Sequence, residues 1–462
     1  MMEVIFMIVM KFGGSCLGQP EGFNKVADIV ASDKRPRIVV ISAVHGITSM
    51  IEGHLASAHA DEESIQSLLD ELKVRHVGLI QKAIKSEEER GKLVQAVDRR
   101  VKKMERLLYG VAYTEELTPR TRDLLMSFGE RLSAPILAAC LRDRDVQALA
   151  FDTDRTGLIT DGEFGNATAN LSAVSLEFAR TMVPKVKEGM VPILTGYFGA
   201  DPEGRVTTFG RGGSDYSAAV VAYAVDAEVL EIWKDVEGFM TSDPKVIPGA
   251  RTIDRLSYQE AAELAYFGAK VLHPRSVEPV MQKGIPIHIR SIDDPKDPGT
   301  LIVGKGYEAP RTIKSVAFTK DIAALKVYGA GVGYKLGVLN KITTALKDKG
   351  INIKSVITAQ TCISLLVEKR DLEPAYKALE KANLNVVEEL ERVSDIALVG
   401  IVGEGLVKTP GLAAKAFTAV ASAGVNVEMI SAGASRVAYY FIIKEKDLER
   451  TVKAVHGEFF HT

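Results

Sequence analysis

The sequence is poor in cysteine: it has three in 462 residues, at positions 16, 140 and 362, and none of them forms a C-x-x-C pair. Disulfide frameworks and structural zinc sites need several closely spaced cysteines, so neither is predicted. The eight histidines show neither zinc-ligand spacing nor a pattern typical of a catalytic triad. We therefore expect a protein of a reducing compartment, the cytoplasm, with no metal site built from its own side chains.

The sequence also lacks an excess of one charge and a long apolar run. Its formal net charge is −2, which offers no general attraction to nucleic acid or to an anionic membrane. The opening apolar run, residues 4–10, is too short to span a bilayer and lacks a basic leader and a cleavage site. With 46% hydrophobic and 26% charged residues, the composition is that of an ordinary soluble protein, and the length predicts two or three domains.

Short apolar runs alternate with longer helical patterns up to about residue 300. Such near-continuous apolar runs are typical of a parallel sheet that is covered on both faces. Helical patterns between them, such as residues 215–224, imply βαβ crossovers and an α/β sandwich. The candidate strands are residues 6–11, 37–42, 146–151, 191–195, 229–234 and 285–289.

Residues 52–118 have a different composition, because they are charged, rich in helix-forming residues and poor in glycine. We interpret them as a solvated helical excursion, and a binding surface is the alternative. Residues 293–299, with two prolines and a glycine, predict a domain boundary near residue 300.

An internal repeat follows this boundary. Gly337 returns as Gly411, Gly350 as Gly424 and Asn352 as Asn426, each time 74 residues later. In each copy a strand is followed by a glycine loop, a helix and a second strand. Two copies are too few for a solenoid, so the repeat predicts a pair of small α/β domains.

Two glycine-rich turns beside charged residues are candidates for a phosphate site. The first is KFGGS at residues 11–15, where side-chain-free residues let the backbone approach an anion and Lys11 adds a positive charge. A tight strand–helix turn with a surface lysine is the alternative. The second is FGRGGSDY at residues 209–216, in which Ser214 or Asp215 could be an ordinary helix N-cap. That alternative does not account for Arg211, whose planar guanidinium suits a carboxylate or a phosphate.

Two further segments add charge to this set. Residues 233–245 begin as a strand that ends in Lys234 and Asp235 and continue as a turn, which suits a nucleotide at the carboxyl edge of the sheet. Residues 268–274 contain Lys270, whose alternative role is to cap the end of a helix. Lysines, an arginine and glycine amides around one phosphate chain are what phosphoryl transfer requires. Neither a P-loop motif nor a protein-kinase motif is present.

These segments resemble the signature motifs of aspartate kinases, within the amino-acid kinase superfamily. The segments at residues 41–48 and 127–133 are similar to that family too, and the order along the chain is the same. The resemblance implies an open αβα sandwich of the carbamate-kinase-like type, followed by two ferredoxin-like ACT domains. The implied boundaries are 1–300 for the kinase domain, 318–390 for the first ACT domain and 395–462 for the second.

The resemblance also implies ATP-dependent phosphorylation of the β-carboxylate of L-aspartate, with Mg²⁺ bridging the phosphates and Lys11 and Asp215 as catalytic residues. The residues implied to bind aspartate are Thr48, Glu130, Arg211, Gly212, Gly213 and Ser214. Those implied to bind the nucleotide are Lys11, Phe12, Gly13, Gly14, Ser15, Lys234, Asp235, Met240, Lys245, Lys270 and Val271. Glu130 suits the α-ammonium group of aspartate and Arg211 a carboxylate.

The ACT pair implies control by an amino acid, lysine or threonine, and assembly as a homodimer or homotetramer. The expected effector-binding residues are Gly337, Val338, Leu339, Lys354 and Thr358. Lys354 stands where some lysine-inhibited members carry an acid, and Met240 stands where an aromatic residue is common. A chain ending at Thr462 is expected to lack the homoserine dehydrogenase of some members. Two alternatives to this function stay open, a superfamily kinase for another acceptor and a catalytically silent amino-acid sensor. The alternative to regulation is that the ACT domains only hold subunits together.

Overall fold

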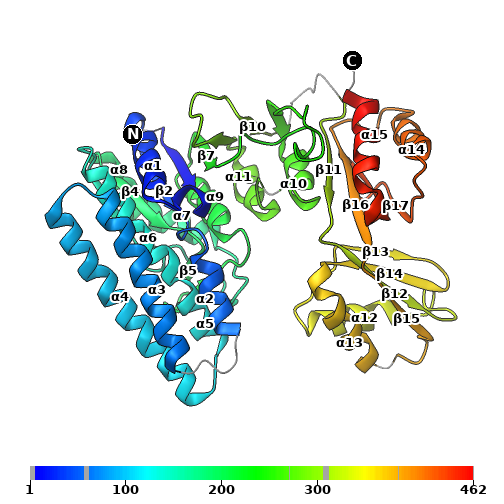
Figure 1. The fold of residues 1–462 in the computed structure, drawn as a ribbon, viewed down its shortest axis with the longest axis horizontal. Helices are drawn as coiled ribbons and strands as arrows, with labels where there is room; N and C mark the ends of the chain where they lie inside the picture. The colour runs from blue at the N-terminus through cyan, green and yellow to red at the C-terminus, as the bar shows by residue number, and fades with distance from the viewer. Residues whose placement is uncertain (1–5, 57–61, 270, 305–311, 383, 461–462) are drawn as a thin grey trace. The chain divides into compact units, whose positions relative to one another are not determined.

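The computed structural model describes residues 6–56, 62–269, 271–304, 312–382 and 384–460 (Figure 1). By their contacts, the residues form two compact units. The first comprises residues 1–239, 252–265 and 270–307, and the second comprises residues 240–251, 266–269 and 308–462. Two short segments of the predicted kinase range therefore belong, by their contacts, to the second unit.

The first unit is built on an eight-stranded sheet. Its strand order is β3-β4-β2-β1-β7-β9-β10-β8, and the described neighbours are parallel except for β9 and β10. All six predicted strands are present, with ends displaced by up to two residues, so the prediction of a largely parallel sheet is confirmed. The strands are β1 (Ile8–Phe12), β2 (Arg37–Ile41), β3 (Ala148–Phe151), β4 (Val191–Thr195), β7 (Val229–Lys234), β8 (Arg255–Ser257), β9 (Ile287–Ser291) and β10 (Thr300–Val303).

Alternate residues of β1 face two different layers of helices, because successive side chains of a strand point to opposite faces. Ile8, Met10 and Phe12 join the apolar core formed with α1 (Pro20–Ser32) and α6 (Phe128–Arg142). Lys11 instead reaches α9 (Gly213–Ala224). The strand period therefore sends the one charged residue of β1 to the side of the sheet where α9 lies.

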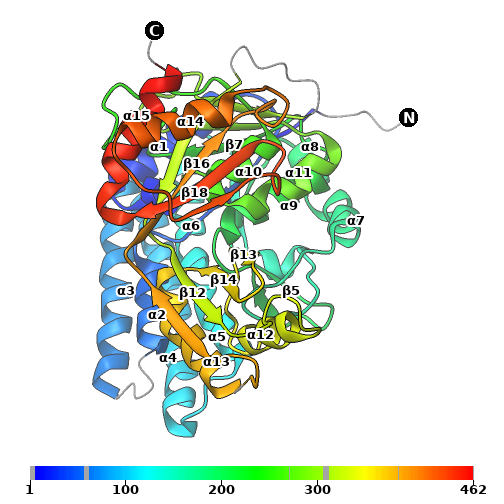
Figure 2. The ribbon, with the colours of Figure 1, turned by 90° about the vertical axis from the view of Figure 1, so that its right-hand side faces the viewer.

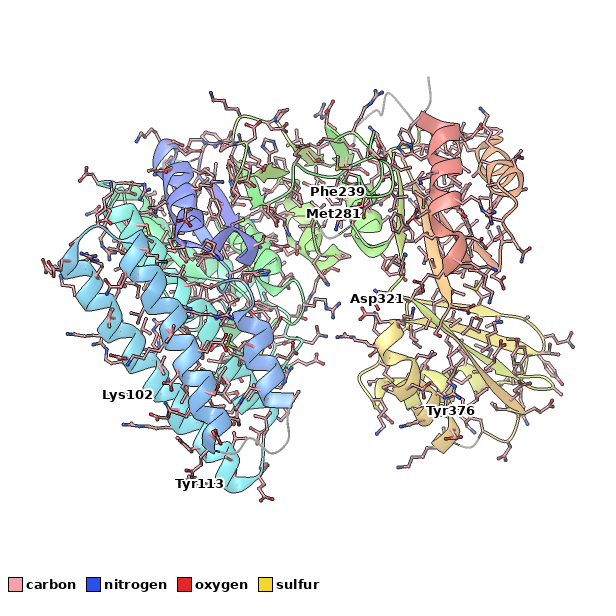
Figure 3. All side chains as sticks on the ribbon, in the orientation of Figure 1. Lys102, Tyr113, Phe239, Met281, Asp321 and Tyr376 are labelled. Atoms are coloured by element: carbon pink, nitrogen blue, oxygen red, sulfur yellow. The ribbon has the colours of Figure 1, made fainter. Side chains whose placement is uncertain are left out.

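The predicted helical excursion is a pair of long helices, α3 (Glu62–Ala83) and α4 (Glu87–Thr114), which lie side by side (Figure 1). Ser86 caps α4 by accepting a hydrogen bond from the backbone N–H of Glu89. Leu72 and Val97 contribute to the apolar core of this unit, whereas Lys102 and Tyr113 lie on exposed surface of α4 (Figure 3). The helical part of the prediction is confirmed.

The remaining elements of the first unit connect these layers. Residues 119–142 are long and apolar enough to cross a membrane by length and composition alone, but 89% of their most apolar window is buried inside the fold. The remaining helices and short strands are α2 (Ile47–Ala56), α5 (Pro119–Met126), α7 (Leu171–Thr181), α8 (Val183–Lys187), α10 (Tyr258–Tyr266), α11 (Glu278–Lys283), β5 (Phe198–Ala200) and β6 (Val206–Thr208).

The second unit contains two four-stranded antiparallel sheets, one for each copy of the repeat. The helices that follow the repeated glycines begin 74 residues apart, at Val338 and Leu412, as the sequence repeat predicts. In the second copy α14 (Leu412–Ser422) and α15 (Leu448–Phe460) pack side by side on the sheet (Figure 2). The first copy comprises β12 (Ala323–Tyr328), α12 (Val338–Lys347), β13 (Ser355–Thr358), β14 (Cys362–Val367), α13 (Leu372–Ala382) and β15 (Glu389–Val393).

The second sheet takes one of its strands from before the first copy. It comprises β11 (Ser315–Thr319), β16 (Ile396–Val402), β17 (Met429–Ser431) and β18 (Ala438–Lys444), with α14 (Leu412–Ser422) and α15 (Leu448–Phe460). Since β11 pairs with β16, the first copy is inserted within the second. Backbone and side-chain bonds also join β11 to the segment 240–251: Val316 N–H donates to the Thr241 carbonyl, and Ser242 Oγ donates to the Val316 carbonyl.

Candidate active site

The candidate site lies at the carboxyl ends of β1, β2 and β7. These strands are adjacent and parallel, with β1 in the middle, so the loops that follow them meet at one edge of the sheet. The chain leaves β1 toward β2 on one side, while β7 joins on the other. Open α/β sheets bind their ligands at such a switch point. The first glycine-rich turn follows β1, Ser42 follows β2 and Asp235 follows β7.

The centre of the site is a buried cluster of three charges. Lys11 Nζ lies 2.5 Å from one carboxylate oxygen of Asp215, and Lys234 Nζ lies 3.3 Å from the other. The side chains of Lys11 and Asp215 are only 5% and 7% exposed. The fold therefore brings together Lys11 of β1, Asp215 after the second glycine-rich turn and Lys234 at the end of β7, which the sequence predicted separately.

The two lysines control the ionisation of Asp215. Burial by itself would favour the neutral acid, but the positive charges of Lys11 and Lys234 outweigh it and lower the pKa of Asp215 to about 2. Burial also lowers the pKa of Lys11 from its ordinary value, and the Asp215 charge opposes that shift. The cluster has two basic groups for one carboxylate, so it is suited to an additional anion.

The first glycine-rich turn is packed tightly against its neighbours. A Cβ atom on Gly14 would lie 2.8 Å from the Ala43 carbonyl oxygen, so a side chain does not fit there. Ser15 Oγ donates a hydrogen bond of 3.0 Å to Asp235, which joins the loops after β1 and β7. The alternative of a turn with a surface lysine is wrong, because Lys11 is buried.

A second carboxylate, Glu130 at the start of α6, lies buried beside the loop that follows β2. Its Oε1 atom accepts a hydrogen bond of 3.1 Å from the backbone N–H of Ala43. Its Oε2 atom is buried and has no hydrogen-bond partner among the described residues. Burial raises the pKa of Glu130 to about 8. Thr48 is half-buried on α2, at the end of the same loop.

Residues 209–213 form the second glycine-rich turn, the acceptor loop. Gly210 and Gly212 have φ values of 71° and 72°, in the left-handed region, and they flank the exposed Arg211. The N-cap of α9 is Gly212, with no side-chain cap bond. The alternative interpretation of Ser214 or Asp215 as the N-cap is therefore wrong, and Asp215 is instead held by the two lysines.

Other predicted residues belong to the second unit or lie outside the described structure, or have no contact with this cluster among the described residues. Met240 and Lys245 belong by their contacts to the second unit, and Lys245 is exposed. Lys270 lies outside the described residues, and Val271 is half-buried.

The predicted effector residues lie in the first sheet domain of the second unit. Gly337, with a φ of 82°, is the N-cap of α12, and a cavity of about 560 Å³ is lined by residues 335–338 together with residues of α12 and of the segment 382–386. Val338 is buried, whereas Leu339 and Thr358 are exposed. The Lys354 ammonium lies 3.6 Å from Glu368 and 5.1 Å from the ring centroid of Tyr266.

The sequence interpretation missed two residues beside the acceptor loop. Tyr197 has a φ of 75°, unusual for a residue with a side chain, and a Cβ atom on Gly213 would lie 2.8 Å from its ring. Arg275 donates to the Phe209 carbonyl at 3.3 Å. Neither residue lies in a motif; the positive charge of Arg275 directly after His273-Pro274 was the only available signal.

Comparisons with known proteins agree with this arrangement. Residues 6–291 match the amino acid kinase family, and residues 317–381 and 399–459 each match ACT domains. Aspartokinase 2 of Arabidopsis thaliana, a chloroplastic protein, is 34% identical over 98% of this chain and 84% of its own length. Lysine-sensitive aspartokinase 3 of Escherichia coli is 32% identical over 98% of this chain and 99% of its own.

Solved structures give the same result. The crystal structure of E. coli aspartokinase III in complex with aspartate and ADP superposes with a TM-score of 0.86 at 30% identity, covering 98% of this chain and 100% of that one. The same enzyme with lysine and aspartate gives a TM-score of 0.82. The matches run through both units, and the fold prediction is confirmed. This chain belongs to the aspartokinase family.

Proposed function

We propose that this protein transfers the γ-phosphoryl group of ATP to the β-carboxylate of L-aspartate, forming 4-phospho-L-aspartate. This is the first step toward lysine, threonine and methionine. Two features carry the proposal. One is the buried Lys11–Asp215–Lys234 cluster, and the other is the buried Oε2 atom of Glu130, beside the loop after β2, which has no hydrogen-bond partner among the described residues. The lysine cluster suits a phosphate group and Glu130 suits an ammonium group, and a kinase acting on an amino acid must bind both.

Phosphoryl transfer to a carboxylate requires the two substrates to be positioned and does not require a strong base. The β-carboxylate of aspartate is ionised at neutral pH. One of its oxygens forms a bond to the γ-phosphorus, the bond from that phosphorus to the β,γ-bridging oxygen breaks, and ADP leaves with the electron pair. Lys11 stabilises the negative charge on the transferring group. Asp215 holds the Lys11 ammonium in place through the 2.5 Å ion pair.

The amino-acid end of the site distinguishes aspartate by its charges. The Glu130 carboxylate receives the α-ammonium group, whose donors satisfy the buried Oε2 atom. Arg211 binds a carboxylate through its planar guanidinium, and Thr48, Gly212, Gly213 and Ser214 are proposed to complete the aspartate site. The close packing of Gly213 against Tyr197 limits the room on this side.

The phosphate chain would lie over the first glycine-rich turn and between the two lysines. Residues 11–15 with Lys234 and Asp235 are proposed for the phosphates, and Met240, Lys245, Lys270 and Val271 for the rest of the nucleotide. Mg²⁺ neutralises phosphate charge when bound. We expect this ion to be held mainly by phosphate oxygens and water, with few protein ligands.

Regulation and assembly follow from the ACT pair. We propose feedback control by lysine or threonine through Gly337, Val338, Leu339, Lys354 and Thr358, in a homodimer or homotetramer. Lys354, paired with Glu368, places a positive charge in this region. Because a lysine effector is also positively charged, the response to lysine is the more informative test. A cytoplasmic location is supported by the three free cysteines, two of them buried.

The test is a coupled ADP-release assay with aspartate, glutamate, N-acetylglutamate, carbamate and UMP as acceptors. Aspartate alone should support rapid turnover, and Lys11→Met should lower kcat by a factor of about 10² or more. Lys25→Met, which removes an exposed lysine paired with Asp293, is the control and should leave kcat unchanged. A faster rate with another acceptor would replace the substrate assignment. Wild-type inactivity with every acceptor would favour the silent sensor.

Titration of the aspartate rate with lysine and threonine, separately and together, tests the regulation.

A further inference from the structure

Arg275 ties the acceptor loop to a neighbouring segment. It lies in the short helical turn Pro274–Val277 and is half-buried. Its guanidinium donates to the Phe209 carbonyl at 3.3 Å and to the Ala167 carbonyl at 2.5 Å. It also donates to the side chains of Asn166 and Thr168, at 3.2 and 3.0 Å. One planar group thereby satisfies acceptors on two separate stretches of chain, which a lysine ammonium cannot do with the same geometry.

Residues 166–168, to which Arg275 donates, belong to a segment that is itself held by hydrogen bonds to other elements. Ala167 N–H donates to the Thr208 carbonyl at the end of β6, and Ala169 N–H donates to the hydroxyl of Tyr216 on α9. The Arg275 guanidinium lies 4.4 Å above the ring of Tyr216. Arg275 therefore joins the beginning of the acceptor loop to the helix that follows the loop and carries Asp215.

The acceptor loop needs such external support. Gly210 and Gly212 have no side chains to restrict their backbones, so contacts with other segments determine the conformation of the loop. His273, two residues before Arg275, lies against Gly212: a Cβ atom there would be 2.3 Å from the His273 Cβ. The 273–275 segment thus contacts the loop at both ends, on either side of Arg211.

We propose that Arg275 is a positioning residue for the phosphoryl transfer: it holds the acceptor loop in the conformation that presents Arg211 to a substrate carboxylate. The proposal rests on the proposed function for the identity of that substrate. Arg275 touches the loop through the Phe209 carbonyl, so its effect reaches the substrate through Arg211. Lys11 and Lys234 hold Asp215 through direct ion pairs, so we expect the phosphate side of the site to be affected much less than the acceptor loop.

The experiment compares wild type, Arg275→Ala and Arg275→Lys, with Arg205→Ala as the matched control. Arg205 pairs with Asp201 and Glu203 and, like Arg275, lies over an aromatic ring, but its contacts are within the β5–β6 turn and with Phe164. We expect Arg275→Ala to raise the KM for aspartate about tenfold, the size expected for one charge-assisted hydrogen bond, with the KM for ATP within a factor of about two. Arg275→Lys should recover part of the loss, and millimolar guanidinium should partly rescue Arg275→Ala.

Hydrogen exchange at the amides of residues 210–214 gives a readout that needs no activity. Exchange there should be faster in Arg275→Ala than in wild type and unchanged in Arg205→Ala. If both variants lower the thermal unfolding temperature equally and neither changes the KM for aspartate, the positioning role is refuted. If Arg275→Ala fails to fold, an unchanged KM in Arg275→Lys refutes it. If wild type does not phosphorylate aspartate, the proposed function fails, and the exchange data alone decide whether Arg275 holds the loop.

Discussion

At the scale of single residues, the site depends on charges that are removed from water. The Lys11–Asp215 pair is nearly inaccessible, and a buried pair is costly to break because the remaining partner keeps an uncompensated charge. Exposed pairs such as Lys25–Asp293, with side chains 52% and 60% exposed, are worth little. Asp215 is therefore expected to matter for folding as well as for turnover.

Asp215→Asn should destabilise the first unit by about 3–5 kcal/mol and abolish most activity, because Lys11 and Lys234 would lose their shared counter-charge. The control Asp293→Asn should cost about 1 kcal/mol or less. The chain has one tryptophan, the buried Trp233 of β7, so its fluorescence during urea unfolding reports on the first unit. Equal midpoints for the two variants would contradict the proposed role of the cluster.

Glu130 predicts a pH dependence of aspartate binding. Its pKa is raised to about 8 by burial, so in the free enzyme it is mainly protonated at pH 7 and becomes ionised as the pH rises through 8. An ammonium group is received by the ionised form. The value of kcat/KM for aspartate should therefore increase from pH 6.5 to above pH 8, since this ratio reports on the free enzyme. Glu130→Gln should lower kcat/KM and flatten the profile, and an unchanged profile in that variant would assign the titration to another group.

At the scale of elements, Phe267, the residue that follows α10, makes an aromatic contact inside the second unit. The Phe267 ring packs against Gly400 of β16, where an added Cβ atom would lie 2.5 Å from the ring, and its centroid is 5.6 Å from that of Tyr440. Gly400 is thus needed for space rather than for an unusual backbone angle. The strand leaves room for an aromatic side chain from a segment more than 100 residues earlier in the sequence.

Gly400→Ala should consequently destabilise the second unit by about 1–3 kcal/mol, through overpacking against Phe267. Phe267→Leu in the same chain should reduce that loss, because the smaller side chain vacates the space. Thermal unfolding of the wild type, the two single variants and the double variant gives the coupling energy. Strictly additive losses would show that the two residues do not compete for the same space.

At the scale of the whole molecule, the chain passes between the two units several times. Residues 240–251 lie in the range that matches the kinase family, yet they bond to β11 of the second unit through Thr241 and Ser242. Two residues proposed for the nucleotide, Met240 and Lys245, lie on this segment. The bonds of Thr241 and Ser242 fix this segment to β11 within the second unit.

Ser242→Ala removes the hydrogen bond to the Val316 carbonyl and should alter the KM for ATP about threefold to tenfold, the range for one neutral hydrogen bond, with a smaller effect on the KM for aspartate. Ser435→Ala is the control, since it removes a side-chain hydrogen bond elsewhere in the same unit. Steady-state kinetics with each substrate varied in turn measures both values. Equal effects of the two variants would exclude a specific role for this bond.

Local patterns were enough to predict much of this protein. Apolar runs located the six strands to within two residues, because a strand buried on both faces must be apolar throughout. The return of Gly337 as Gly411 revealed the paired domains. A glycine recurs there because the residue before the helix has a left-handed backbone conformation in both copies. The signature turns identified Lys11, Asp215 and Lys234 as members of one family motif set.

Tertiary structure alone decided which of these residues meet. Contacts between distant segments pair β11 with the second sheet and join residues 240–251 to the second unit. Such contacts also place Tyr197 and Arg275 beside the acceptor loop. The sequence determined the kinds of element and the chemistry they carry, since periodicity and side-chain type are local. Burial and the choice of partners, which set the pKa of Glu130 and the charge balance at Asp215, exist only once the chain has folded.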